Sequence, residues 1–349
     1  MSDKTELLCI GNPIVDFYLN INESLALKYG ITDPVQHISV EQVESFLREP
    51  YVDFASAVKS SGGGSANVAK IASMLGMKAV FLGCTGNDEN AGIFRQEMSE
   101  AGVTSVLTQS NERTGICFAC NLGDEIRFAA YPGAALELTE ADIRDELIDN
   151  AEAVVLDGYI LDRRSLVLRI LMRASHKGIP VALDVASIMQ VKNKAEEILT
   201  YSRSFPLFVF MNADEAITFF NTIRKTRDED VPSTDKEKEE MILRDVCPML
   251  KIITDGEIYP IVVVKLGGRG AVVIAGGNVY REETFTIIPR DTVGAGDSFC
   301  AAFISAWIRG KSLSECAALG NKVAREILQV PETHLKSAKF KSFAKTLGN

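Results

Sequence analysis

The stretch Asp291-Thr-Val-Gly-Ala-Gly-Asp297, which runs directly into Ser298-Phe-Cys-Ala-Ala-Phe303, is the most informative part of this sequence. Its small Gly-Ala-Gly residues allow the backbone to turn tightly into an apolar helix, with their amide groups at the helix N-terminus. An anion at that position is stabilised by unpaired N–H donors and by the helix dipole. Asp297 then lies beside the anion, where it can accept a proton from a hydroxyl group that attacks a bound phosphoryl group. The alternative is an ordinary loop with an aspartate near a helix N-cap.

Short apolar runs without polar alternation recur along the chain, and turn residues bound each of them. They are Leu7–Ile10, Ala79–Leu82, Ala153–Leu156, Val181–Leu183, Leu207–Met211 and Ile261–Leu266. Such runs are typical of strands that are covered on both faces of a parallel sheet. Amphipathic segments with helical spacing lie between them: Ser65–Leu75, Ala91–Ala101, Arg164–His176 and Ser298–Ile308. The alternation predicts an α/β fold with an open, doubly wound, mostly parallel sheet.

Two regions interrupt this alternation. Ile14–Ile21 and Thr114–Tyr131 have the partial polar alternation of exposed strands, and the second contains a hairpin signal. We therefore expect a single domain over residues 1–349, with a small β-sheet lid formed by about residues 13–45 and 113–131.

Composition excludes several classes of protein. A chain of 349 residues with 46% hydrophobic residues is neither a disordered tail nor a fibre. The formal charge of −10 disfavours nucleic-acid binding, because such a surface repels a phosphate backbone. The seven scattered cysteines indicate reduced thiols, and Cys117 and Cys120 lack the second pair that a zinc site needs. No signal peptide and no membrane-length apolar stretch is recognisable, so we expect a cytoplasmic protein. The charge-rich segment Arg224–Glu240 is interpreted as a solvated excursion that leads into a helix.

Two further glycine-rich motifs follow or precede predicted elements. Lys265-Leu-Gly-Gly-Arg-Gly-Ala271 follows a buried strand, where glycines let a ligand approach the backbone. A tight hairpin between strands is the alternative. Ser61-Gly-Gly-Gly-Ser-Ala-Asn67 precedes a helix and ends in an amide that can both donate and accept hydrogen bonds. A flexible loop without function is the alternative there.

Two acidic positions also have two interpretations each. In Met211-Asn-Ala-Asp-Glu215, Asn212 and Glu215 have the spacing of a capping box, but Glu215 could instead hold a water on magnesium. Asp16, in Gly11-Asn-Pro-Ile-Val-Asp16, could bind paired hydroxyl groups of a sugar or be a surface carboxylate. The histidines at positions 37, 176 and 334 show no spacing of metal ligands.

Taken together, Gly62-Gly-Gly-Ser-Ala-Asn67 and Asp291–Asp297 resemble, in order and spacing, the two signatures of the ribokinase-like (PfkB) carbohydrate kinase family. The opening Gly11–Asp16 is similar to the adenosine kinase branch, and Ala134-Ala-Leu-Glu-Leu-Thr139 to adenosine-kinase-like sugar kinases of bacteria. The resemblance implies a Rossmann-like core with a small β lid. It also implies transfer of the γ-phosphoryl group of ATP to a hydroxymethyl group of a ribonucleoside or sugar.

The resemblance implies roles for three sets of residues. The set at the transferred phosphoryl group comprises the catalytic base Asp297, the anion hole Gly294, Ala295 and Gly296, and Arg127, which would offset negative charge in the transition state. The set that holds the acceptor comprises Asp16, Gly63 and Asn67. The set at the nucleotide comprises Asn212, Glu215, Lys265, Gly267, Gly270 and Asn321, with Glu215 holding the metal through water.

The implied ligands are ATP, Mg²⁺ and a small-molecule acceptor, and a monovalent cation such as K⁺ is compatible with the family. We expect a monomer or homodimer with no nucleic-acid or membrane partner. Three alternatives are considered: a kinase for a free sugar such as ribose or fructose, a non-catalytic binding regulator on the same fold, and an NAD-dependent oxidoreductase. The last is disfavoured, because no GxGxxG fingerprint follows Leu7–Ile10.

Overall fold

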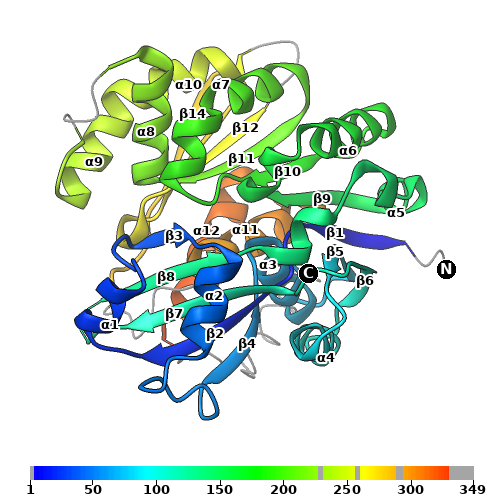
Figure 1. Cartoon of the computed structure of the whole chain (residues 1–349). Helices are drawn as coiled ribbons and strands as arrows, with labels where there is room; N and C mark the ends of the chain where they lie inside the picture. Colours follow the sequence, from blue (N-terminus) through cyan, green and yellow to red (C-terminus); the bar gives the residue numbers. More distant parts are fainter. Residues whose placement is uncertain (1–3, 124, 227–230, 256–259, 288–293, 330–349) are drawn as a thin grey trace.

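A computed structural model describes residues 4–123, 125–226, 231–255, 260–287 and 294–329. Within these residues the chain forms two β-sheets and the helices that cover them (Figure 1). No helix in the described ranges is both long enough and apolar enough to cross a membrane.

The larger sheet has nine strands in the order β14-β13-β12-β11-β10-β9-β1-β5-β6. Its strands are β1 (Thr5–Ile10), β5 (Ala79–Thr85), β6 (Thr104–Gln109), β9 (Ala151–Asp157), β10 (Val181–Asp184), β11 (Leu207–Asn212), β12 (Ile261–Lys265), β13 (Ala271–Ala275) and β14 (Asn278–Glu282). All neighbours pair in parallel except β12, β13 and β14, which form an antiparallel edge. All six predicted strands lie in this sheet, so the predicted fold class is confirmed.

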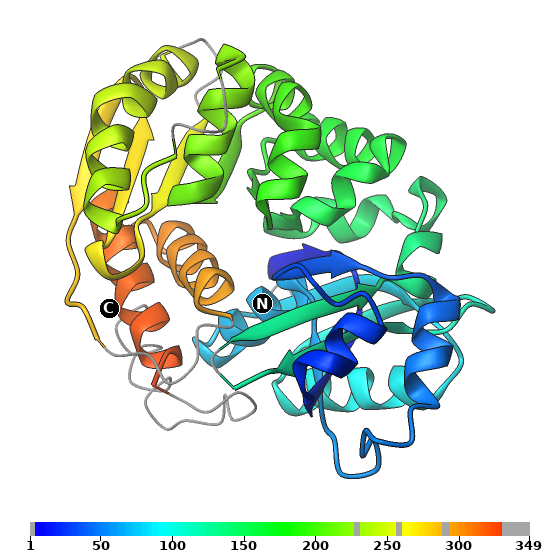
Figure 2. The same cartoon turned by 60° about the vertical axis from the view of Figure 1, so that its left-hand side comes forward.

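Helices cover both faces of the nine-stranded sheet, which explains the unbroken apolar runs. Leu7 and Cys9 of β1 pack with α3 (Gly64–Met74), α4 (Glu89–Glu100), α11 (Ala295–Ile308) and α12 (Leu313–Ile327). Leu8 and Ile10 point to the other face, which carries α5 (Asp145–Asp149), α6 (Arg164–Lys177), α7 (Ile188–Ser204), α8 (Ala213–Arg224) and α10 (Cys247–Thr254). Successive strand residues thus enter two separate hydrophobic clusters. Figure 2 shows α11 and α12, in orange and red-orange, side by side on one face.

The smaller sheet, called the lid sheet below, has the strand order β3-β8-β7-β2-β4. Its strands are β2 (Ile14–Asn20), β3 (Val35–His37), β4 (Val58–Gly62), β7 (Gly115–Asn121) and β8 (Ile126–Tyr131). Both segments that interrupt the α/β alternation therefore pair with each other, and β4 joins them from outside the expected ranges. Two helices, α1 (Glu23–Lys28) and α2 (Val40–Leu47), cover this sheet, and the rings of Phe46 and Phe118 meet at 4.9 Å.

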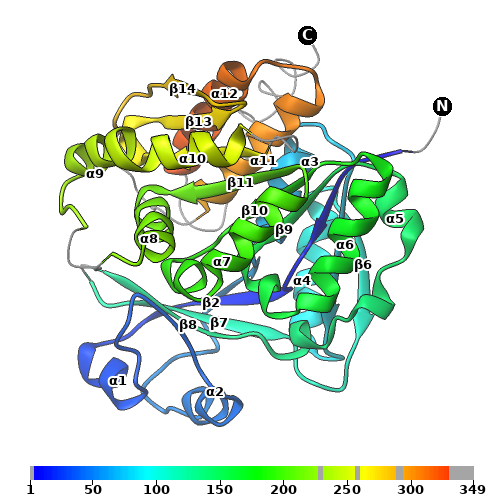
Figure 3. The same ribbon diagram turned by 90° about the horizontal axis from the view of Figure 1, so that it is seen from above.

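The two sheets meet where the parallel strands end. Figure 3 shows β2, β7 and β8 running along one side of the larger sheet, next to the end of β1, with α1 and α2 on their far side. Four short 3₁₀ turns are also described: η1 (Gly133–Glu137), η2 (Glu140–Asp142), η3 (Gly158–Asp162) and η6 (Gly267–Arg269). The α-helix α9 (Asp235–Met241) continues into a π-helical turn, η5 (Ile242–Val246). In open α/β sheets, ligands bind at the carboxyl ends of the strands, so the edge next to the lid sheet is the place to look for a site.

Candidate active site

A cavity of about 820 Å³ lies between the carboxyl edge of the larger sheet and the lid sheet. One half, called the acceptor half, has lining residues from the lid sheet and from the ends of β1 and β9: Asn12, Ile14, Asp16, Val35, His37, Gly63, Gly64, Cys117, Phe128, Ala130, Pro132, Asp157 and Tyr159. The other half, called the nucleotide half, includes Asp184, Asn212, Glu215, Lys265, Gly267, Gly268, Gly270, Phe285, Thr286, Asn321 and Arg325. The start of α11, residues 294–297, also lines the cavity.

Asp297 lies in the first turn of α11. The helix begins after Gly294, whose φ of 74° is left-handed and favours glycine. The amide Nδ2 of Asn67 donates a hydrogen bond of 2.9 Å to Asp297 Oδ2. Burial, together with the charge of Asp184, raises the pKa of Asp297 to about 6. Its carboxylate is therefore ionised at neutral pH yet more basic than an exposed aspartate, which suits a general base.

The glycine-rich start of α3 faces the same cavity. Gly63 has φ 99°, and a Cβ at this position would lie 2.2 Å from the carbonyl oxygen of Asn12, so only glycine fits. Gly63 lines the cavity as the sequence suggests. The side chain of Asn67 instead bonds to Asp297, so its observed contact is with the candidate base.

Asp16 lies on β2 opposite Cys117 of β7 and lines the acceptor half. Burial raises the pKa of Asp16 to about 7, although the nearby ammonium of Lys70 acts in the opposite direction. A Cβ on Gly62 would lie 2.1 Å from Asp16 Oδ2, so the backbone of β4 closely approaches this carboxyl group. The placement in the cavity favours the hydroxyl-binding interpretation over a surface carboxylate.

Asn212 and Glu215 form a capping box at the start of α8. Asn212 Oδ1 accepts from the backbone N–H of Glu215 at 2.9 Å, and Glu215 Oε2 accepts from the N–H of Asn212 at 2.7 Å. Both residues also line the nucleotide half, so the structural and the functional interpretations are compatible. Burial raises the pKa of the Glu215 carboxyl group to about 7, and the charge of Lys265 opposes this rise.

Lys265, at the end of β12, pairs with an acidic group of the nucleotide half. Its Nζ lies 2.6 Å from Asp184 Oδ2, and a Cβ on Gly296 would lie 3.2 Å from it. Although burial opposes it, the negative charges of Asp184 and Glu215 raise the pKa of the Lys265 ammonium group. A permanently charged lysine therefore lies directly beside the start of α11.

The glycine-rich turn after β12 is both a hairpin connection and part of the cavity wall. It joins the antiparallel strands β12 and β13, and Gly267 and Gly270 line the nucleotide half. Asn321 of α12 lines the same half, and its Nδ2 is 3.4 Å from the carbonyl oxygen of Glu282.

A buried glutamate of α9 holds this turn through two arginines. Glu239 is 6% exposed, and its carboxylate accepts hydrogen bonds from the Nε of Arg269 and, at 2.9 Å, from the Nε of Arg281. Arg281 in turn donates to the carbonyl oxygen of Arg269. Thus the charge-rich segment expected to be solvated contributes a buried side chain that fixes the nucleotide side of the cavity.

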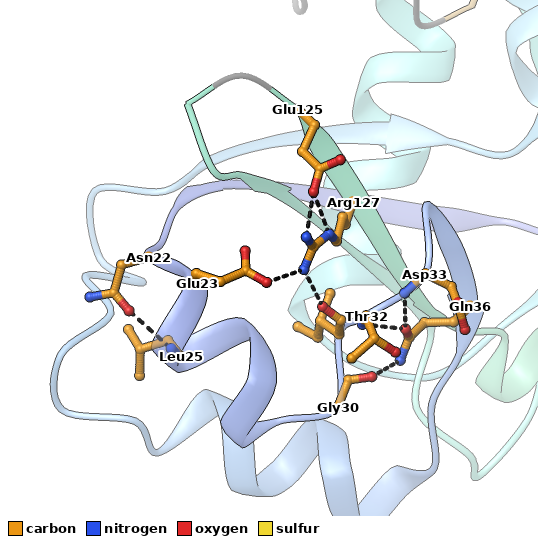
Figure 4. A network of polar contacts seen from close by, with 10 residues as sticks. Asn22, Glu23, Leu25, Gly30, Thr32, Asp33, Gln36, Glu125 and Arg127 are labelled. Atoms are coloured by element: carbon orange, nitrogen blue, oxygen red, sulfur yellow. Dashed lines mark hydrogen bonds and ion pairs between the residues drawn. The ribbon is translucent and has the colours of Figure 1, made fainter.

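Arg127 does not line the cavity in this structure, so its position lends no support to the expectation that it reaches the transferred phosphate. Its guanidinium group bonds to Glu125 Oε1 at 2.7 Å, and to Glu23 Oε1 and the carbonyl oxygen of Ile31 at 3.0 Å each (Figure 4). The physical reason is strand alternation: Phe128 faces the cavity, so Arg127 faces the other side of β8.

Two acidic residues of the site were not predicted from the sequence. Asp157 ends β9 and is 3% exposed, and Asp184 ends β10 and is 8% exposed. Each directly follows a predicted strand, and the carboxyl end of a parallel strand is where ligand-binding side chains gather. That position in the chain is the signal by which both could have been found.

The cysteines contribute no metal site in the described part of the chain. All seven are free and buried, and Cys117 and Cys120 lie together on β7. No cluster of three or more metal-ligating side chains occurs among the described residues.

Comparison with known proteins gives a consistent result. The family model of the pfkB family carbohydrate kinases matches residues 26–339. Adenosine kinase of Schizophyllum commune is 23% identical over 342 residues, which covers 93% of this chain and 95% of the relative. The 5-dehydro-2-deoxygluconokinase of Bacillus subtilis is 24% identical over 275 residues, which covers 76% of this chain and 80% of the relative. The crystal structure of adenosine kinase from Sinorhizobium meliloti superimposes with a TM-score of 0.82 at 23% identity, covering 98% of this chain and 99% of that one.

Proposed function

Because the chain belongs to the pfkB family of carbohydrate kinases, it is an ATP-dependent phosphotransferase with an alcohol acceptor, and we propose that it phosphorylates the hydroxymethyl group of a ribonucleoside. The observation that carries the proposal is the meeting of Asp297, the start of α11 and Asp16 in one cavity. A free sugar is the second candidate acceptor, since Asp16 would serve its hydroxyl groups equally well.

The residues of the cavity account for each part of the transfer. Asp297 takes the proton of the acceptor hydroxyl group as the oxygen forms its bond to the γ-phosphorus, and the bond to the β–γ bridging oxygen breaks to release ADP. The amide groups at the start of α11 and the ammonium of Lys265 stabilise the charge that develops on the phosphoryl oxygens. Asn67 orients Asp297 through its 2.9 Å hydrogen bond.

The acidic groups of the nucleotide half fit a magnesium ion. Mg²⁺ prefers oxygen ligands and is usually bound by one or two carboxylates together with substrate phosphates. Asp184 and Glu215 supply carboxylates that line this half. Bound Mg²⁺ would neutralise charge on the phosphates. A requirement for a monovalent cation such as K⁺ stays a prediction.

The walls of the acceptor half favour a nucleoside over a free sugar. Val35 and Phe128 are paired neighbours on β3 and β8, and both line the cavity. The rings of His37 and Tyr159 lie 5.8 Å apart at 46°, which brings the lid sheet against η3. A flat nucleobase would cover this apolar and aromatic surface, whereas a free sugar would leave it exposed to water.

A panel of nucleosides and sugars, each with ATP and Mg²⁺, tests the proposal by ADP formation. We expect turnover with at least one ribonucleoside, and a kcat/KM at least about tenfold above that of ribose or fructose, as expected when apolar contacts are lost. ADP formation with sugars alone would establish the second candidate. No ADP with any acceptor would contradict the kinase assignment and favour a binding regulator.

Two further expectations accompany this function. The reduced, buried cysteines agree with a cytoplasmic location, which cell fractionation tests. A monomer or a homodimer is expected, and light scattering in solution distinguishes them.

A further inference from the structure

Three aspartates border one short stretch of backbone in the acceptor half. A Cβ on Gly64 would lie 3.3 Å from Asp157 Cβ and 3.5 Å from Asp297 Oδ1, so these two carboxyl groups flank the same residue. A Cβ on Gly62 would likewise lie 2.1 Å from Asp16 Oδ2. The acceptor therefore binds beside three acidic side chains, of which Asp297 is needed as a base and Asp16 as a ligand for hydroxyl groups.

The cations near these aspartates are directed elsewhere. Lys70 is 5% exposed, and its Nζ donates to the carbonyl oxygen and, at 3.1 Å, to the Oγ of Ser61. Arg163 donates to Asn12 Oδ1 at 2.6 Å and to a backbone carbonyl group. Neither side chain lines the cavity, and Lys265 is paired with Asp184 in the nucleotide half. Among the described lining residues, the acceptor half thus contains no lysine or arginine.

Asp157 is held rigidly at this position. Its Oδ2 accepts a hydrogen bond of 2.5 Å from the Oγ of Ser65, and its Oδ1 accepts from the backbone N–H of Tyr159 at 3.2 Å. Because these bonds tie the carboxyl group to α3 and η3, it cannot turn away from an incoming ligand. The carboxyl group of Asp157 therefore lies beside every acceptor that enters the cavity.

We propose that Asp157, together with Asp16, makes the site selective for uncharged acceptors and excludes sugar acids and sugar phosphates. A bound anion would lose its hydration without gaining a cationic partner, and its charge would oppose the ionised forms of Asp16 and Asp157 in a poorly screened environment. The inference deepens and rests on the proposed kinase function.

The test uses matched acceptor pairs that keep the primary hydroxyl group: ribose with ribonate, which differ by one charge, and a ribonucleoside with its 3′-monophosphate, which carries about −1.5 to −2 charges. In the wild-type protein we expect kcat/KM for the uncharged member to be at least about 100-fold higher, as one repelled, unpaired charge predicts. In Asp157→Asn, which keeps the shape of the side chain, this ratio should fall by about tenfold or more. An acid member turned over within about tenfold of its neutral partner by the wild-type protein would overturn the inference.

Asp162→Asn is the matched control. Asp162 is the last residue of η3, its side chain is 56% exposed, and its carboxylate pairs with Lys194 at 3.1 Å. The ratio should stay unchanged in this variant. An equal fall in both variants would mean a general effect of net charge and would overturn the role of Asp157, as would an unchanged ratio in folded Asp157→Asn.

Calorimetric titration of the same acceptors without turnover distinguishes this inference from the kinase function. Preferential binding of neutral acceptors without ADP formation would refute the kinase function alone. ADP formation with equal use of neutral and acid members would refute the selectivity alone. If Asp157→Asn does not fold, the ratio in the wild-type protein still decides whether the acceptor half excludes anionic acceptors, and the ratio in Asp16→Asn tests the contribution of the other carboxyl group.

Discussion

Replacing Asp297 by Asn should abolish most turnover and at the same time stabilise the protein. The asparagine keeps the size of the side chain, and its Oδ1 can still accept the hydrogen bond from Asn67, which is 2.9 Å long in the wild-type protein. It cannot accept the proton of the acceptor hydroxyl group. Loss of a general base lowers rates by about 10² to 10⁴, and we expect kcat to fall by that factor with little change in the KM for ATP.

The gain in stability follows from the pKa of the same group. The pKa of Asp297 rises from 3.8 to about 6, mainly because the carboxyl group is buried. The folded protein therefore holds the proton more tightly than the unfolded chain, and the free energy of unfolding of the wild-type protein falls as pH rises through this window. At about pH 7.5 the ionised, buried carboxyl group lowers the free energy of unfolding of the wild-type protein by at most about 3 kcal/mol. For a chain of this length that is an increase of up to about 4 °C in Tm for the variant.

Two measurements check the reasoning together. ADP formation gives kcat, and thermal unfolding at about pH 4 and pH 7.5 gives the stability difference between variant and wild-type protein, which should be small at the lower pH and larger at the higher. Wild-type kcat in folded Asp297→Asn would remove this residue from the chemistry. A stability difference that does not change with pH would refute the argument from burial.

Four other changes have distinct expected outcomes. Asp16→Ala should raise the KM for the acceptor by about tenfold or more with a smaller change in kcat, because it removes ground-state binding, and steady-state kinetics with varied acceptor measures both. Arg127→Ala should leave kcat within about twofold and cause only a modest loss of stability in denaturant unfolding, because its two glutamate partners are largely exposed to solvent; a large fall in kcat alone would support its predicted catalytic role. Glu215→Gln should raise the magnesium concentration needed for half-maximal rate, whereas lower thermal stability alone would leave only the helix cap. Glu239→Gln should raise the KM for ATP several-fold without affecting that for the acceptor, because two arginines lose their common partner beside the nucleotide turn, and the exposed Glu240→Gln on the same helix is the control.

Much of the fold could be predicted because each buried strand reads as an unbroken apolar run. Leu7–Ile10 supplies side chains to both hydrophobic clusters, so its composition alone indicates a strand covered on both faces. β4 could not be found in this way, because Val58–Gly62 is short and partly polar and is defined by its pairing with β2. Such pairing depends on residues distant in sequence, which a local pattern does not contain.

The candidate site shows the same division between local and distant information. Asp297 and Gly63 are placed by local backbone requirements, a helix start and a left-handed glycine, and these are readable in the sequence. The role of Arg127 is implied by the family resemblance alone, but the direction of its side chain depends on which face of β8 meets the cavity. Phe128, its neighbour, carries that information, because an apolar residue on a lid strand indicates the covered face.

The charges of the site divide by the ligand that each half would hold. Both halves contain carboxylates, but among the described lining residues those of the acceptor half, Asp16 and Asp157, have no lysine or arginine beside them. The lysine that lines the cavity among the described residues, Lys265, is instead placed at the start of α11, where phosphoryl oxygens would gather. The acceptor half would thus disfavour an anion, whereas the nucleotide half supplies cationic groups for one. An anionic acceptor would find carboxyl groups and no cation in the acceptor half. A comparison of kcat/KM between charged and uncharged acceptors therefore tests this arrangement more directly than a comparison between acceptors of different size.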